Sequence, residues 1–345
     1  MKIDGPLIAG INEAAEKAQL LQEMGYDGAY TLEGNSDPFY PLLLAAEHAP
    51  GLDLVTSIAV AFPRNPMHLA YQAWDLQTFS KGHFLLGLGS QIRAHIEKRF
   101  GTEFSRPAAR MRELILAMKA IFACWHDGER LDFRGEFYTH TLMTPIFNPG
   151  PNAFGKPPIL MGALGPKMTE VAGEVSDGIL IHPFNSMPFV TEQTLPALDR
   201  GLAMGGRKRD DIKISLAAMI ITGKTEEEYK AAETAVKNLL GFYGSTPAYK
   251  PPMEAVGLGD LQPELNALSK QGKWIEMGQR VDDKFLDAFC VRGEPDTIAD
   301  QLIKRYKGIP DRLSVYAPYA SDPSIWPDIL SKVKAGCTKN DEENS

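Results

Sequence analysis

The sequence predicts an α/β fold, a (β/α)8 TIM barrel with insertions at the carboxyl-end face of its strands. Short apolar segments alternate with segments of helical spacing eight times along the 345 residues, which is the repeat of such a barrel. Most of the apolar segments are continuous runs, as is typical of parallel strands buried on both faces. A doubly wound open sheet is the structural alternative.

Four strand–helix units are expected in the first third of the chain. The first helix has helical spacing of its apolar residues and stops at Gly25, a common C-terminal signal. The second has Asp37 as its predicted cap and Pro38 in its first turn. We expect strands over 2–8, 26–33, 52–62 and 83–90, and helices over 11–25, 37–49, 65–80 and 107–125.

Four more units follow a β-rich excursion over 129–140. We expect strands over 157–163, 177–184, 211–223 and 312–319, and helices over 166–175, 187–205, 225–244, 294–308 and 324–336. The segment 244–290 interrupts the alternation of strand and helix segments and is predicted to be an insertion, or lid, before the last unit. Residues 1–335 are expected to form a single domain, and 336–345 a polar tail.

Composition and charge limit the class of protein. A net charge of −8 and a pI near 5.5 argue against nucleic-acid partners. Three cysteines without CxxC spacing favour a reducing compartment, and no signal peptide or membrane span is evident, so we expect a cytoplasmic protein. There is no HExxH or HxH metal motif, no GxSxG elbow and no Walker sequence, so no metal is expected.

In a TIM barrel, function lies at the carboxyl ends of the strands. The sequence GALGPK follows the fifth strand there. Gly162 and Gly165 let the backbone approach a ligand, and Pro166 suits a first helical turn. The free N–H groups of that turn favour phosphate or carboxylate, and Lys167 could add a positive charge. The alternative is a plain turn that uses glycine and proline only to change direction.

Two further segments end in polar residues at the same face. Thr56 and Ser57 interrupt the third strand, which indicates a bulge or a flat surface, unless the hydroxyls are simply bonded to backbone. After the fourth strand, LLGLGSQIRAH carries a polar cluster. His95 in that cluster could exchange a proton near neutral pH. The alternative is a solvated, charged helix face.

Taken together, these segments resemble the bacterial luciferase-like flavin-dependent oxidoreductases over nearly the whole chain. Within them the chain looks like the branch that uses the deazaflavin coenzyme F-420, close to methylenetetrahydromethanopterin reductases and mycobacterial relatives. The resemblance rests on SIAVAFPRNP through LLGLGSQIRAHIEKRFG and on GALGPKMTEVAGEVSDGIL. Three positions depart from the family's pattern: His83 replaces a usual Arg, Glu33-Gly34 replaces Asp-His, and GSQIR replaces a G-E acid.

The resemblance implies roles for individual residues. Ser57-Ile58 would be a non-proline cis peptide against the ring of the cofactor, and His182 would lie beside its ribityl–phosphate tail. The phosphate would be held by Gly162, Ala163, Leu164, Gly165, Pro166 and Lys167, with Ser90 also binding cofactor. Glu33, Gln91, Arg93 and His95 would be catalytic, with His95 or Glu33 carrying the proton. Phe242, Tyr243, Tyr249 and Trp274 would roof the substrate pocket.

The resemblance also implies a function. We expect hydride transfer between coenzyme F-420 and a small alcohol, carbonyl or enoyl compound. One alternative is an FMN-dependent monooxygenase that uses reduced flavin and dioxygen. A separate flavin or deazaflavin reductase would be its partner and supply the reduced cofactor. A second is a non-catalytic barrel that binds a flavin or phosphate ligand. A homodimer is expected to form through the helices after the second and third strands.

Overall fold

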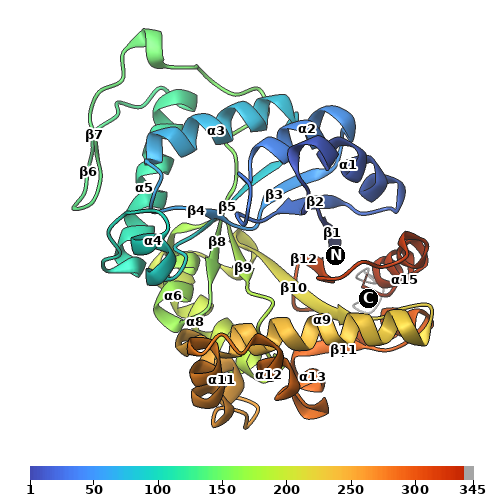
Figure 1. The fold of residues 1–345 in the computed structure, drawn as a ribbon. Coiled ribbons are helices and arrows are strands. Elements are labelled where there is room, and N and C mark those ends of the chain that lie inside the picture. The colour runs from blue at the N-terminus through green and yellow to red at the C-terminus, as the bar shows by residue number, and fades with distance from the viewer. Residues whose placement is uncertain (338–345) are drawn as a thin grey trace, which may run out of the picture.

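The computed structural model describes residues 1–337, and its strands close into a barrel surrounded by helices (Figure 1). Each barrel strand runs parallel to both neighbours, in the order β1-β2-β3-β5-β8-β9-β10-β12, and β12 pairs with β1 to close the ring. The predicted (β/α)8 barrel is therefore confirmed, and the open-sheet alternative is excluded. The predicted tail lies mostly in 338–345, outside the described residues.

The barrel strands are short and buried along nearly their whole length, which explains their continuous apolar sequences. Leu54, Leu86 and Leu216 are each at most 1% exposed. The strands are β1 (Lys2–Pro6), β2 (Gly28–Thr31), β3 (Asp53–Thr56) continued by β4 (Ala59–Val60), β5 (Phe84–Gly89), β8 (Ile159–Ala163), β9 (Gly178–Ile181), β10 (Lys213–Ile221) and β12 (Arg312–Tyr316).

The outer helices follow the predicted ranges closely where a capping side chain or a proline marks their start. Asn65 caps α3 and Thr225 caps α9 through their side-chain oxygens. The helices of the ring are α1 (Ala14–Glu23), α2 (Tyr40–His48), α3 (Pro66–Phe79), α5 (Pro107–His126), α6 (Pro166–Val175), α7 (Met187–Phe189), α8 (Leu195–Met204), α9 (Glu226–Gly244), α14 (Pro295–Tyr306) and α15 (Trp326–Cys337).

The predicted cap of α2 is wrong. The helix begins at Tyr40, with Pro41 rather than Pro38 in its first turn. Asp37 instead accepts the N–H of Phe39 ahead of the helix and pairs with Arg64 across 3.2 Å. The carboxylate is thus used for a contact to the loop after β4, a tertiary partner that no local pattern can indicate.

A buried ion cluster fills the amino-terminal end of the barrel. The guanidinium of Arg312 on β12 forms a two-pronged contact with Asp4 on β1 and donates to Asp53 on β3 at 2.6 Å. His83 lies 2.9 Å from the same Asp53 carboxylate. These side chains join three strands at the end opposite the expected site, so they serve the barrel rather than the reaction.

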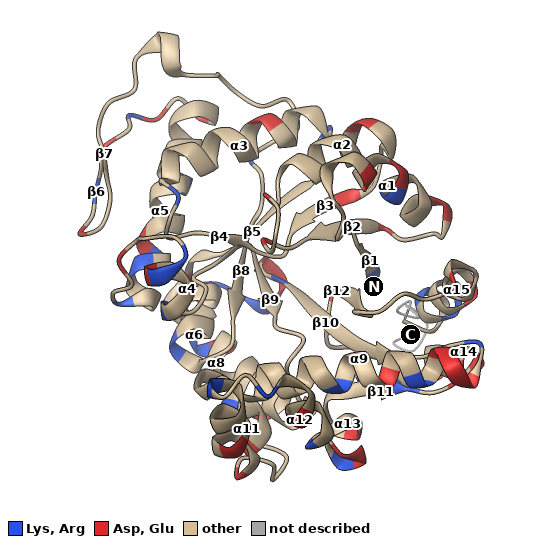
Figure 2. Cartoon of the chain, viewed as in Figure 1, with Lys and Arg blue, Asp and Glu red and all other residues tan. Residues whose placement is uncertain are grey.

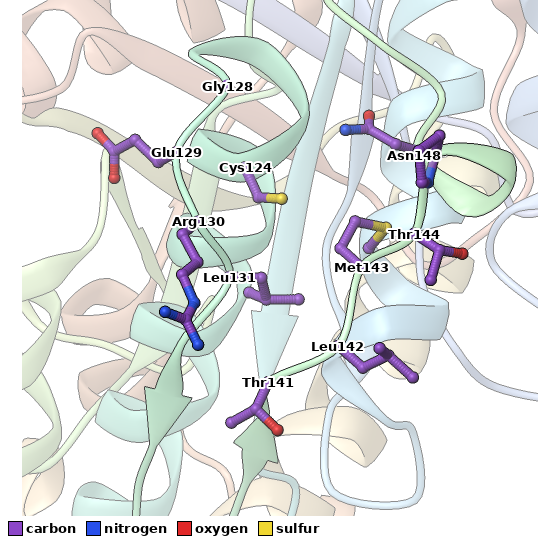
Figure 3. Close-up of a pocket in the computed structure, with 11 residues that line it drawn as sticks. Cys124, Gly128, Glu129, Arg130, Leu131, Thr141, Leu142, Met143, Thr144 and Asn148 are labelled. Atoms are coloured by element: carbon purple, nitrogen blue, oxygen red, sulfur yellow. The ribbon is translucent and has the colours of Figure 1, made fainter.

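Two excursions leave the regular repeat. The hairpin β6 (Phe133–Arg134) and β7 (Thr139–His140) starts an arm that projects from the barrel and returns over α3, where Tyr71 donates to the carbonyl of Phe147. A cavity of about 490 Å³ lies between this arm and the end of α5 (Figure 3). Cys124 and Leu131 face Met143 across it, and none of its lining residues reaches the barrel mouth.

The second excursion is the segment 244–290, which is helical. It contains α10 (Lys250–Glu254), α11 (Leu261–Lys270), α12 (Trp274–Gln279) and α13 (Asp283–Phe289), and it ends in the short strand β11 (Cys290–Arg292) beside β10. Its apolar residues form a second core with α9 and the ends of β9 and β10, in which Phe184 stacks on Phe289 at 4.5 Å. No helix in residues 1–337 is long and apolar enough to cross a bilayer.

Candidate active site

A cavity of about 510 Å³ opens at the carboxyl ends of the barrel strands. It is lined from β2, the β3–β4 break, the loops after β5, β8 and β9, the strands β10 and β12, and the end of α9 with the loop that follows it. The predicted site residues that line it are Glu33, Ser57, Ile58, Ser90, Gln91, His95, Gly162, Ala163, Leu164, Gly165, His182, Phe242, Tyr243 and Tyr249. Residues from six separate segments of the sequence thus meet in one cavity.

The floor of the cavity on one side is the break between β3 and β4. The Ser57–Ile58 peptide bond is cis, and the chain there turns its Ile58 side chain into the cavity. Around the break, Thr56 exchanges two hydrogen bonds of 2.8 Å with the backbone of Gly87. Because β3 ends at Thr56 and β4 begins at Ala59, the predicted interruption is a true break in the strand. The Thr56 hydroxyl is also bonded to backbone, as the alternative held.

Glycines on the neighbouring strands make room for this break. A Cβ on Gly87 would lie 1.8 Å from the carbonyl oxygen of Thr56, and one on Gly89 would lie 2.9 Å from Ile58. A Cβ on Gly162 would lie 3.1 Å from Ile58. The glycine spacing of β5 is thus explained by the break between β3 and β4.

Gly165 differs from these glycines. A Cβ there would meet no atom within 4 Å, and its φ of −76° is open to any residue. Gly165 lines the cavity as the N-cap residue of α6 and supplies no side chain to the first-turn N–H groups. The protein's own packing does not require glycine here, and the open position leaves room for a ligand at this helix start.

Two predicted phosphate contacts stand outside the cavity lining. Pro166 and Lys167 are exposed, because α6 begins at Pro166 and its first turn carries both side chains away from the cavity. The loop therefore meets the cavity through Gly162, Ala163, Leu164 and Gly165, mostly with backbone.

Glu33 sits at the edge of the cavity and is held in place by two donors. Its Oε2 accepts the N–H of Val60 at 2.7 Å and the guanidinium of Arg64 at 2.6 Å. The side chain is only 7% exposed. Both donors contact the same carboxylate oxygen, so they fix the orientation of the Glu33 side chain.

The loop after β5 contributes three of its four predicted residues. Ser90, Gln91 and His95 line the cavity, and Gln91 adopts a φ of 55° while its side chain accepts the N–H of Ile92. Arg93 points elsewhere: it pairs with Glu97 at 2.7 Å and lies over the ring of Phe104. That i,i+4 pairing on α4 (Arg93–Lys98) draws Arg93 to the outer surface.

An aromatic wall, which we define as His182, Tyr243, Tyr249 and Tyr316, closes another side of the cavity. Tyr243 and Tyr316 share a hydrogen bond of 2.9 Å between their hydroxyls. The His182 ring packs edge-on against Tyr243 at 4.9 Å, and its Nε2 lies 3.5 Å from the hydroxyl of Tyr249. The wall is therefore a continuous aromatic surface with hydroxyl and imidazole groups at hand.

Burial fixes the protonation states in this wall. It lowers the pKa of His182 to about 4, so the ring is neutral at neutral pH. Since Nδ1 accepts the N–H of Phe184 at 3.0 Å, the ring proton resides on Nε2. Burial also raises the pKa of Tyr243, Tyr249 and Tyr316, so these hydroxyls stay protonated.

Trp274, the fourth residue predicted to roof the substrate pocket, lies outside the cavity lining. Trp274 on α12 is 53% exposed and packs against Phe242 with 6.3 Å between ring centroids, so it reaches the cavity only through that neighbour. The residues that the sequence did not single out include Tyr30, Met168, Ala217, Thr246 and Ser314. Tyr30, Ala217 and Ser314 sit within buried strands, and only the closed barrel reveals which strand residues face the cavity.

No group of three or more His, Cys, Asp or Glu side chains in residues 1–337 could hold a metal ion. The chemical groups of the cavity are thus one fixed carboxylate, two imidazoles, hydroxyls and amides. Such a set can bind and orient an organic ligand and can move a proton, but it offers no obvious nucleophile.

Comparisons with known proteins agree with this geometry. The luciferase-like monooxygenase family matches residues 3–312. An uncharacterized protein of Mycobacterium tuberculosis is 50% identical over 313 residues, 91% of this chain and 92% of that protein. A 5,10-methylenetetrahydromethanopterin reductase of Methanolobus tindarius is 28% identical over 294 residues, 82% of this chain and 83% of that one.

Among solved structures, the coenzyme F-420-dependent tetrahydromethanopterin reductase from Methanopyrus kandleri superimposes with a TM-score of 0.79. It is 20% identical, and the match covers 97% of this chain and 98% of that one. This structural likeness concerns the fold, whereas the sequence match spans the barrel and its mouth. The chain therefore belongs to the luciferase-like monooxygenase family and is a luciferase-like oxidoreductase of the flavin- or deazaflavin-dependent kind.

Proposed function

We propose that this protein is a coenzyme F-420-dependent oxidoreductase that transfers a hydride between the deazaflavin and a small organic alcohol, carbonyl or enoyl compound. One observation carries the proposal. A single cavity holds both an apolar surface at Ile58, cleared by Gly89 and Gly162, and a helix start at Gly165 where glycine is not needed for packing. A planar ring with a phosphate tail, in a deazaflavin as in a flavin, needs these two features in one site, and the titration below distinguishes the two cofactors.

The residues present fit such a cofactor. The bound cofactor would supply hydride transfer at carbon 5 of its ring. Ser57 and Ile58 would support one face of the ring, and the first-turn N–H groups of α6 would hold the phosphate. Leu32, Ile92 and Leu164 line the same cavity and would exclude water from the ring.

His95 is the residue that we propose to carry the proton. It lines the cavity from the first turn of α4 and is partly exposed, so it can exchange protons with solvent. Glu33, the other candidate, is engaged by Val60 and Arg64. We propose that Glu33 and Gln91 orient the ring and the substrate instead.

The rival function is an FMN-dependent monooxygenase, and the name of the matching family favours it. Such an enzyme would need reduced flavin from a separate reductase. The two functions differ at the cofactor, because a deazaflavin has carbon at ring position five and does not form the usual oxygen adduct. A barrel that binds either cofactor without turnover is the remaining alternative.

The proposal is tested by titrating the protein with coenzyme F-420 and, in parallel, with FMN, while its tryptophan fluorescence is recorded. Tight binding of coenzyme F-420 alone is the expected result. A clear preference for FMN would overturn the proposal in favour of a monooxygenase. Binding of coenzyme F-420 without hydride exchange in any alcohol, carbonyl or enoyl compound would favour the non-catalytic alternative.

A further inference from the structure

The aromatic wall faces the surface on which the cofactor ring is proposed to lie. In the closed order of strands, β10 stands opposite β3, and β9 and β12 flank β10. His182 follows β9 and Tyr316 ends β12, whereas Ile58 lies in the break after β3. A ring lying on Ile58 would therefore turn its free face to this wall.

The wall is rigid because the second core supports it from behind. Phe184 stacks on Tyr249 with an interplanar angle of 27° and on Phe289 with one of 26°. Tyr243 and Tyr316 both pack against the same core. Groups held in this way lose little conformational freedom when a ligand binds, which favours selective recognition.

The wall offers hydrogen-bond donors but no charge. His182 carries a neutral Nε2–H, since its Nδ1 accepts the N–H of Phe184. This Nε2–H lies 3.5 Å from the hydroxyl of Tyr249, which can accept it and donate its own hydrogen to a ligand. The two hydroxyls of Tyr243 and Tyr316 share one hydrogen bond, so one of their two hydrogens is left for a ligand. An oxygen with lone pairs is the natural partner of such a surface.

The cavity lining holds no permanently charged cation. None of the residues that line the cavity, all within the described part of the chain, is Lys or Arg. Figure 2 places most Lys and Arg on the outer helices, away from the barrel axis. Arg64, which lies near the cavity edge, is already paired with Glu33 and Asp37. A carboxylate or phosphate on the substrate would thus be buried against the wall without a countercharge, which is costly.

We propose that the aromatic wall is the substrate-binding surface and that it selects an uncharged organic molecule with a carbonyl or hydroxyl oxygen and an apolar body, while rejecting anionic compounds. This inference rests on the proposed function for the position of the ring. It goes further by assigning the substrate's charge class and by naming Tyr316, with Tyr243, as a residue that determines specificity. It also assigns His182, which the resemblance placed beside the cofactor's tail, to the substrate side.

The test uses two pairs of size-matched probes: benzyl alcohol against benzoate, and cyclohexanone against cyclohexanecarboxylate. Each is titrated into the protein saturated with coenzyme F-420, and the fluorescence of the deazaflavin is recorded. Each neutral probe is expected to bind at least about tenfold more tightly than its carboxylate partner, because the buried charge lacks a partner. Equal or tighter binding of the carboxylates would overturn the inference, as would no binding of either neutral probe.

Variants assign the effect to the wall. Tyr316→Phe is expected to weaken the neutral probes about three- to tenfold, the usual effect of one lost hydrogen bond, while the affinity for coenzyme F-420 changes less than about twofold. Tyr306→Phe, a fully buried tyrosine of α14 outside the cavity, is the matched control and should change neither. Equal behaviour of the two variants contradicts the assignment.

A variant that should gain affinity for an anion provides a second test if Tyr316→Phe folds poorly. Ala248 lies at the exposed rim of the cavity, so Ala248→Lys should be tolerated. It is expected to tighten benzoate binding about two- to fivefold, with Ala248→Gln as the uncharged control. Unchanged benzoate binding in Ala248→Lys would mean that absent positive charge is not what excludes anions.

The failure of the proposed function gives a different result. If the wild-type protein does not bind coenzyme F-420, that function fails, and the probes are titrated calorimetrically into protein saturated with FMN, or into protein alone. The preference for neutral probes and its dependence on Tyr316 are still expected, because the wall belongs to the chain itself. Loss of that preference under these conditions overturns the present inference independently.

Discussion

At the scale of single residues, Gly165 separates what the fold requires from what a ligand requires. Nothing in the described structure touches a Cβ placed there, and its backbone suits any residue. Gly87 and Gly89 are fixed by their neighbours in the barrel, but Gly165 is not. Substitution at Gly165 can therefore test binding without disturbing folding.

Gly165→Asp is expected to weaken binding of a phosphate-bearing cofactor about tenfold or more, since a carboxylate roughly 5 Å from an anion costs about 1 to 3 kcal/mol. The free energy of unfolding should rise by roughly 0.3 kcal/mol, because Asp is a slightly better N-cap than Gly. Fluorescence titration and urea unfolding measure the two quantities. Gly165→Asn is the control for side-chain size, and an equal loss of affinity in both variants would contradict an electrostatic effect.

His182 gives a prediction for pH dependence. Its pKa is about 4 in the folded protein, because the ring is buried, and near 6.5 when unfolded. Between these values the unfolded state binds the extra proton, so stability falls as pH drops from 6.5 toward 4, by up to about 3 kcal/mol. Urea unfolding at pH 7 and pH 5 should show this loss for the wild type and a smaller one for His182→Gln. An identical pH dependence in both would show that His182 does not titrate in this way.

At the scale of elements, the break between β3 and β4 shapes the strands beside it. The distance from an added Cβ to its nearest neighbouring atom rises from Gly87 through Gly89 to Gly162. Only at Gly87 is that nearest atom a backbone atom. A backbone carbonyl cannot move aside as an isoleucine side chain can. The three glycines therefore form a graded series.

We expect Gly87→Ala to destabilise the protein most, by about 3 kcal/mol or more, Gly89→Ala less, and Gly162→Ala least, because overpacking costs roughly 1 to 3 kcal/mol where neighbours can yield. Gly10→Ala is the control, as a Cβ there meets no atom within 4 Å. Urea unfolding of the four variants gives the order. A loss at Gly162→Ala equal to that at Gly87→Ala would contradict this account of the break.

Elements with local signals were predictable, and those set by tertiary contacts were not. Pro166 and the apolar spacing after it gave α6 its correct ends. The start of α2 was missed because Asp37 is used by Arg64, which is distant in sequence. In the site, the loop residues after the strands were found from their position, whereas Tyr30 and Ser314 required knowledge of which strand residues face the cavity. Lys167 and Trp274 do not line the cavity, which the sequence could not indicate because it does not give side-chain direction.

At the scale of the whole molecule, several large apolar side chains remain exposed on α2 and on the arm. Tyr40 and Leu43 lie on α2, and Ile146 and Phe147, which are 85% and 62% exposed, lie on the arm. The arm returns over α3, the helix after the third strand, where Tyr71 donates to the carbonyl of Phe147 (Figure 1). Large apolar side chains left exposed in this way commonly mark subunit interfaces.

We therefore keep the predicted homodimer as a proposal. The double variant Ile146→Asp with Phe147→Asp should shift the protein to a monomer in size-exclusion chromatography with light scattering, because two charges would be buried in an apolar contact. Ile275→Asp, on α12 and 73% exposed, is the matched control and should leave the assembly unchanged. A wild-type monomer at micromolar concentration would overturn the proposal.

The ion cluster at the amino-terminal end of the barrel has a consequence for biosynthesis. Asp4 is made early, but the guanidinium paired with it comes from Arg312, on the last barrel strand. Asp53 has Lys2 of β1 beside it at 2.5 Å, whereas on the ribosome Asp4 must wait for almost the entire chain before it acquires its countercharge. A nascent chain that stops before Arg312 would keep an unclosed sheet edge, and would be a natural target for chaperones and proteases.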